Sequence, residues 1–157
     1  MLRGESSKEM SDYYIRFIPD APYYELNSNE IADIRSFVWY GDNVHIIVSA
    51  TLLFADAGEN FESVNCPFCK FALMDWWGGA MNEAYSSNEG FTDINIFTPC
   101  CNRATTLHNL DYYFSQGFYK SIVEIKPELI HSIDDKQICE QLRGVTNTSW
   151  RAIHNRI

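Results

Sequence analysis

Four of the five cysteines fall into two clusters whose spacing suits a metal site. The first cluster is Cys66-Pro67-Phe68-Cys69, and the second is Thr98-Pro99-Cys100-Cys101. A Cys-x-x-Cys turn directs two sulfurs at one point, and a second cysteine cluster beside it can complete a tetrahedral zinc site. We therefore predict one Zn²⁺ ion held by Cys66, Cys69, Cys100 and Cys101.

The second cluster is less regular than the first, because its two cysteines are adjacent. When the clusters are aligned on their prolines, Cys101 matches Cys69 and Thr98 stands where a cysteine would be expected. The fourth ligand must then be Cys100 or His108. His108 follows Cys101 by seven residues, so it could reach the ion if that segment turns back. We keep His108 as the alternate fourth ligand.

Other roles for the cysteines are less favoured. A disulfide framework is disfavoured because the cysteine count is odd and no apolar signal peptide follows Met1, which together predict a reducing cytoplasmic location. Cys66-Pro67-Phe68-Cys69 also resembles a glutaredoxin active site, and Thr98-Pro99 resembles the Thr-cis-Pro element of that fold. There Cys66 would attack, Cys69 would resolve and Pro99 would be the cis-proline. Thiol exchange gives Cys100 and Cys101 no role. A third alternative is that the cysteines are buried structural residues without a metal or redox role.

The elements that must position the cysteines alternate along the chain. Apolar periodicity predicts strands over 13–18, 44–48, 61–64, 91–97 and 118–125, and helices over 28–40, 73–85 and from Ser132 and Asp135 to Gly144. Residues 51–54 extend the second strand or form its neighbour, and 148–157 slightly favours a strand. The strands over 61–64 and 91–97 each end at a cysteine cluster.

This alternation predicts an α+β fold. We expect a mixed sheet with helices mainly on one face and an inserted zinc-ribbon-like metal site at about 61–108. A single domain would cover 12–157, preceded by a flexible arm over 1–11, which is polar and aperiodic.

Two adjacent glycines, Gly78 and Gly79, interrupt the helix predicted after the first cluster. Each costs about 1 kcal/mol relative to alanine in a helix, so an offsetting cause is expected. Close packing of the helix backbone against the sheet is the simpler cause, and a kink at a ligand site is the functional one.

The chain is acidic, with a formal charge of −9 at pH 7. Between Asp20 and Glu62, eight acidic residues stand against one basic residue. Four thiolates on Zn²⁺ add further negative charge, so a phosphate backbone would be repelled, and neither nucleic acid nor a membrane is the expected partner. We expect a basic protein instead, bound by the carboxylates of Asp56, Glu59 and Glu62 on a polar turn.

Several segments carry a resemblance that spans about 13–126. They are Tyr14–Pro19, Cys66–Cys69, Met74–Trp77, Ala80-Met81, Phe91–Asp93 and Thr98–Cys101. Together they resemble a family of uncharacterised bacterial cytosolic proteins with a zinc-ribbon-like CPxC…TPCC signature. The resemblance implies cysteine zinc ligands and no established activity. Some members carry a sugar transport ATPase label, but this sequence has no nucleotide-binding motif. It departs from the family at Gly78-Gly79, and at Asn102, where a glycine would suit the turn.

These features favour a non-enzymatic, zinc-stabilised acidic binding protein, such as an inhibitor or immunity-type protein for a basic, nuclease-like partner. An acidic surface can occupy a cleft built for phosphates and associate with it rapidly. An all-cysteine zinc site leaves no coordination position for a catalytic water, and no GxGxxG, GxSxG or HExxH motif is present. The alternative function is a thiol-disulfide oxidoreductase of glutaredoxin type.

Overall fold

The computed structural model describes residues 13–126 and 134–156, so the predicted arm over 1–11 and Ser132 lie outside the described residues. The helices are α2 (Ser28–Arg35), α3 (Met74–Ala84), α4 (Asp135–Thr146) and the short 3-10 helix η1 (Leu107–Asn109). The strands are β1 (Tyr13–Pro19), β2 (Val44–Ala55), β3 (Ser63–Asn65), β4 (Tyr85–Ser86), β5 (Gly90–Phe91), β6 (Asn95–Phe97), β7 (Ala104–Thr106), β8 (Asp111–Tyr113), β9 (Gly117–Ile125) and β10 (Trp150–Arg156). No helix within these ranges is long and apolar enough to cross a membrane.

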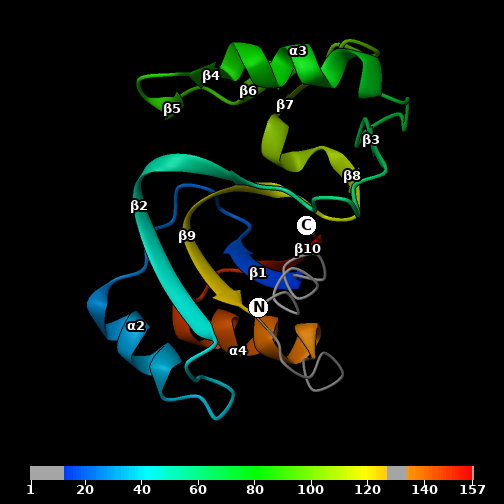
Figure 1. The fold of residues 1–157 in the computed structure, drawn as a ribbon. Coiled ribbons are helices and arrows are strands. Elements are labelled where there is room, and N and C mark those ends of the chain that lie inside the picture. The colour runs from blue at the N-terminus through cyan, green and yellow to red at the C-terminus, as the bar shows by residue number, and fades with distance from the viewer. Residues whose placement is uncertain (1–12, 127–133, 157) are drawn as a thin grey trace, which may run out of the picture.

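The main sheet has six strands in the order β10-β1-β9-β2-β5-β4 (Figure 1), and its strand pairings are antiparallel. Strands β1 and β2 run in the same direction with β9 between them. Likewise, β9 and β10 run together with β1 between them. Helix α2 joins the first pair and α4 joins the second, which is the connectivity of a split β-α-β motif. The α+β class is confirmed. The expectation of a mixed sheet is wrong, because strands that run in the same direction are never neighbours: β9 lies between β1 and β2, and β1 lies between β9 and β10.

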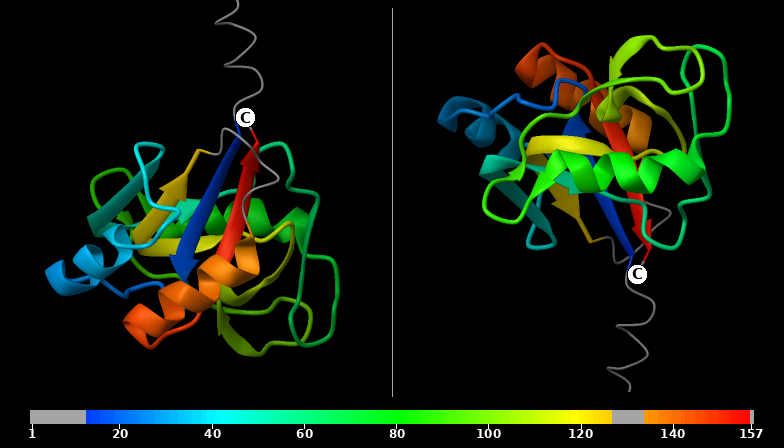
Figure 2. Two further views of the ribbon diagram at one scale, coloured as in Figure 1. Left: turned by 90° about the horizontal axis from the view of Figure 1, so that it is seen from below. Right: turned by 90° about the horizontal axis from the view of Figure 1, so that it is seen from above.

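Helices α2 and α4 lie together on one face of this sheet, and the left view of Figure 2, seen from that side, shows α4 across the ends of β1 and β10. Ile34 of α2 and Leu142 of α4 are fully buried against Ile15 and Phe17 of β1. Because side chains alternate along a strand, Ile18 of β1 lies in a separate cluster on the opposite face. The sheet is therefore apolar on both faces near its centre.

Helix α2 begins with a capping box. The Asn27 side chain accepts a hydrogen bond from the Glu30 N–H, and the Glu30 carboxylate accepts one from the Asn27 N–H. The helix ends at Arg35 rather than at residue 40, because the Ser36 hydroxyl bonds the Asp33 carbonyl and the chain turns there. Val38, which lies inside the range predicted as helix, is consequently outside α2 and 95% exposed.

Helix α4 runs through Gly144, where the sequence predicted its end. Asn147 takes the left-handed conformation instead, with φ of 62°. The last turn is fastened to β10 because the Thr146 hydroxyl donates to the Leu142 carbonyl and accepts a hydrogen bond from the indole N–H of Trp150. The C-terminal segment is a strand that pairs with β1 along its length.

The chain between β2 and β9 forms an insertion that contains α3 and the two cysteine clusters. It packs on the side of the sheet opposite α2 and α4 (Figure 1), through a core that includes Val64, Leu73, Ile94, Leu107 and Phe118. The single strand predicted over 91–97 is broken into β5 and β6. The break lies at Asp93, whose carboxylate accepts the Asn95 N–H. As a result, β5 joins the main sheet and β6 pairs with β7.

Candidate metal centre

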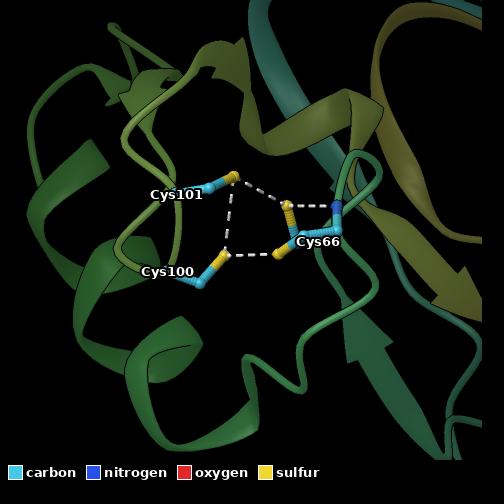
Figure 3. A group of neighbouring side chains, drawn as sticks. Cys66, Cys100 and Cys101 are labelled. Atoms are coloured by element: carbon cyan, nitrogen blue, oxygen red, sulfur yellow. Dashed lines mark hydrogen bonds between the residues drawn. The ribbon is translucent and has the colours of Figure 1, made fainter.

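Four cysteine sulfurs come together where two turns of the insertion face each other (Figure 3). The sulfurs of Cys66, Cys69, Cys100 and Cys101 all lie within 4.8 Å of one another. The Sγ–Sγ distance is 3.7 Å for Cys66 and Cys101 and 3.3 Å for Cys69 and Cys100, and all four thiols are free. Four sulfurs bound to one zinc ion at tetrahedral positions lie about 3.8 Å apart. The cluster therefore has the size of a tetrahedral thiolate site that could hold a metal ion.

The first turn starts directly after β3 and folds back through local backbone bonds. Cys66 donates its N–H to the Phe71 carbonyl at 2.9 Å, and its own carbonyl accepts the Lys70 N–H at 3.0 Å. Lys70 closes the turn in the left-handed conformation, with φ of 66°. The N–H groups of Phe68 and Cys69 then point at the Cys66 sulfur, at 3.4 and 3.5 Å. Such donors stabilise a thiolate and orient it toward an ion.

The second turn repeats this backbone pattern after β6. Thr98 donates its N–H to the Arg103 carbonyl at 2.9 Å, and its carbonyl accepts the Asn102 N–H at 2.7 Å. Asn102 is left-handed with φ of 57°, as a residue at the glycine position of such a turn must be. The backbone thus has the alignment inferred from the sequence, with Cys101 at the position of Cys69.

Cys100 supplies the fourth sulfur from a position that is not a ligand position in the first turn. Its counterpart there is Phe68, which is exposed and lies under the Arg103 guanidinium at 4.7 Å. This cation–π contact joins the two turns on their outer side. Because the backbone turns sharply between the two adjacent cysteines, Cys100 and Cys101 both reach the cluster, with their sulfurs 3.9 Å apart.

His108 lies outside the sulfur cluster. It is fully buried in η1, where its Nδ1 accepts the Phe118 N–H at 2.8 Å and its Nε2 donates to the Asp20 carbonyl at 2.9 Å. Both ring nitrogens therefore have structural partners. The 3-10 helix turns the ring toward the start of β9, so the structure does not bring the alternate fourth ligand to the other candidate ligands.

The protein environment separates the acidities of two of these thiols. At Cys66 burial raises the pKa of the thiol, but hydrogen bonds from the N–H groups of Cys69 and Phe68 and from the neighbouring thiols of Cys100 and Cys101 together outweigh burial and lower that pKa to about 6. Burial, followed by the interaction of the protonated Cys100 thiol with the neighbouring cysteine sulfurs, raises the pKa of Cys100 to about 12. Cys66 therefore loses its proton more readily than Cys100, and a bound cation would favour the thiolate form of both.

The three carboxylates predicted to bind a partner differ in their surroundings. Asp56 accepts hydrogen bonds from the Gly58 N–H at 2.9 Å and from the Asn155 amide at 2.8 Å, so it holds the loop onto β10. Glu59 and Glu62 are exposed on the same loop. Of the three residues, therefore, only Glu59 and Glu62 can be replaced without loss of hydrogen bonds that hold the loop in place.

The glycine pair in α3 is not explained by packing against the sheet. At both Gly78 and Gly79 an added Cβ would meet no atom within 4 Å. Gly79 lines a groove of about 550 Å³ between α3 and β6, which sequence reasoning did not identify. The costly glycine pair was the one signal in the sequence that pointed to it.

The comparisons with known proteins leave the site to be interpreted from its own geometry. No family model matches the chain, and neither a curated protein nor a solved structure shows significant similarity to it. The family resemblance inferred from the cysteine clusters therefore stays a prediction.

Proposed function

We propose that this chain is a non-enzymatic binding protein whose insertion is held together by one Zn²⁺ ion and whose partner is a basic protein. The observation that carries the proposal is the close approach of four free sulfurs, all within 4.8 Å of one another, from two turns of matching backbone geometry. Cys66, Cys69, Cys100 and Cys101 would be the ligands. Zinc suits them because soft thiolates in a tetrahedral set favour it over hard cations.

The role of such an ion would be structural. Four thiolates fill a tetrahedral zinc site, so no position is left for a water or a substrate. The ion would instead join two turns that are distant in sequence and fix α3 and β6, which flank them. Because the four ligands come together only in the folded chain, binding of the ion would favour the folded insertion.

The charge of the chain supports a basic partner. The formal charge is −9, and Glu59 and Glu62 are exposed on the loop that leads to the first turn. An inhibitor or immunity-type protein for a nuclease-like partner would use such carboxylates in place of phosphates. Duplex DNA should not bind, because its phosphates would be repelled.

Thiol-disulfide exchange is the second candidate, favoured by one observation: the lowered pKa of the Cys66 thiol, about 6. Two other observations weigh against it. Cys66 is fully buried, whereas an attacking thiolate must reach its disulfide. The peptide bond before Pro99 is trans, so Pro99 does not have the cis geometry that this mechanism assigns to it.

Metal analysis tests the zinc site. Protein purified without added metal should contain one zinc per chain by elemental analysis. Replacement of Cys66 or Cys69 by serine should lower the zinc content and the free energy of unfolding. Cys139→Ser is the matched control, because Cys139 lies in α4, outside the cluster. Full zinc content in both ligand variants would contradict the assignment.

Charge reversal tests the partner. The doubly substituted Glu59→Lys, Glu62→Lys protein should fold and keep its zinc but associate more slowly with a basic partner. For the unmodified protein, the association rate should fall steeply as salt rises past about 0.15 M, where the Debye length is about 8 Å. Recovery of the same partners by both proteins from native cytosol would show that the acidic loop serves only solubility.

A further inference from the structure

A groove of about 550 Å³ runs between α3 and β6, beside the metal centre. Its α3 wall includes Trp76, Gly79 and Glu83, and its other wall includes Asp93 and Phe97. Figure 1 shows β6 and β7 close to α3 within the insertion. The groove belongs entirely to the insertion and involves none of the four cysteines.

The groove runs along the open edge of β6. Asn95, Ile96 and Phe97 all line it, although successive side chains of a strand point to opposite faces. The other edge of β6 is taken by β7. The flanking bonds from Thr98 N to Arg103 O and from Leu107 N to Ile94 O set the register, so the backbone groups of Asn95 and Phe97 point away from β7. The Asn95 N–H is already bonded to the Asp93 carboxylate, so an extended chain laid in the groove would meet mainly the backbone N–H and carbonyl of Phe97.

Gly79 keeps the α3 wall low enough for a backbone to approach. A Cβ at this position would meet no atom of the protein within 4 Å, so the glycine is not required for internal packing. A glycine in a helix costs about 1 kcal/mol relative to alanine. Any side chain at position 79 would project into the groove, so the need to leave space for a ligand would explain why a glycine is kept there despite its cost.

The groove combines negative charge with aromatic surface. Glu83 and Asp93 are exposed carboxylates on its two walls, and the described residues that line it include no Lys or Arg. Trp76 is half-buried and Phe97 is 67% exposed. Carboxylates beside aromatic faces favour a Lys or Arg side chain, through ion pairs and cation–π contacts.

We propose that this groove binds an extended basic segment of a partner protein, which adds as a strand to the open edge of β6. Its backbone would bond Phe97, and its Lys or Arg side chains would lie against Glu83 and Asp93. This mode of recognition takes affinity from main-chain bonds and specificity from alternate side chains. The inference rests on the proposed function in requiring a basic partner, and it assigns the docking surface to the groove.

The metal centre would set the width of this groove. Helix α3 starts at Met74, shortly after Cys69, and β6 ends at Phe97, immediately before the turn that carries Cys100. The two walls are therefore continuous with the two turns that the ion would join. Removal of the metal with a chelator should weaken binding in the groove without any change in its residues.

The test uses a short synthetic peptide of alternating Lys and Val, with binding to the zinc-loaded full chain measured by calorimetry. Gly79→Leu should weaken binding about tenfold or more, because its side chain would fill the groove. Gly78→Leu is the matched control, since residue 78 is also open but does not line the groove. The same peptide N-methylated at alternate residues should lose affinity, and a Glu-Val peptide should not bind.

Three results would overturn the inference: no binding of the Lys-Val peptide, equal weakening by both leucine variants, or full affinity of the methylated peptide. Zinc content measured on the same samples separates the two proposals. One zinc per chain without peptide binding would support the zinc site and contradict the proposal that the groove binds a peptide. Peptide binding that depends on Gly79 in protein that holds no zinc would support the groove proposal and contradict the zinc site.

Discussion

Thr98 occupies in the second turn the position that Cys66 occupies in the first. Each residue donates its N–H to the carbonyl five residues later, at 2.9 Å in both turns. The Thr98 hydroxyl accepts the Arg103 N–H at 2.9 Å and lies 3.2 Å from the Cys101 sulfur. A hydroxyl thus replaces a thiol at this point, and the cluster regains its fourth sulfur from Cys100.

Replacement of Thr98 by valine should destabilise the second turn. Thr98 is buried, and valine keeps its shape but leaves the Arg103 N–H without its acceptor. We expect the free energy of unfolding in urea to fall by about 1–3 kcal/mol, with the zinc content unchanged. Thr98→Ser keeps the hydroxyl and is the control. Equal stability of the two variants would mean that the hydroxyl has no role in the turn.

Replacement of Gly117 by alanine should disturb the start of β9. An added Cβ would lie 2.8 Å from Cε1 and 2.9 Å from Nδ1 of the His108 ring, which is held by hydrogen bonds on both sides. Overpacking of this kind costs about 1–3 kcal/mol. Gly144→Ala is the opposite case, because that position in α4 is open, and it should add about 1 kcal/mol through helix propensity. Thermal and urea unfolding at fixed zinc would measure both.

Acid should destabilise the protein through His108. Burial, followed by the nearby Arg151 guanidinium, lowers the pKa of this histidine to about 4. Between about pH 6.5 and 4 the unfolded chain therefore binds a proton that the folded protein does not, and stability falls as the pH falls. The full effect is about 3 kcal/mol. The free energy of unfolding of His108→Gln should depend less on pH than that of the unmodified protein. Any loss of metal in acid would affect both proteins equally, so parallel pH profiles would contradict the assignment.

The protein should reduce disulfides poorly. Thiolates bound to zinc are weak attackers, and Cys66 is buried even without an ion. Turnover of a glutathione mixed disulfide should be far below a glutaredoxin rate for metal-loaded protein. Rapid turnover that disappears in Cys66→Ser would make thiol-disulfide exchange the function instead.

The sequence by itself determined the features that depend on near neighbours in the chain. The capping box of Asn27 and Glu30 is such a feature, because its bonds span only three residues. The equivalence of Thr98 with Cys66 could also be read directly, since each turn is closed by its own backbone. For the same reason most of the predicted strands and helices were found near their expected positions, although α2 and α4 ended at different residues and the short strands β4, β7 and β8 were not predicted.

Only the tertiary structure decided how these pieces meet. The interleaved order of the sheet depends on which strand pairs with β9, and local pattern does not encode that choice. His108 turns away from the cysteines because its ring nitrogens bond the Asp20 carbonyl, which is distant in the chain, and the Phe118 N–H, which lies across a turn. Asp56 becomes part of the loop structure through Asn155 on the last strand. The groove beside Gly79 exists because β6 lies next to α3, and packing between separate elements creates it.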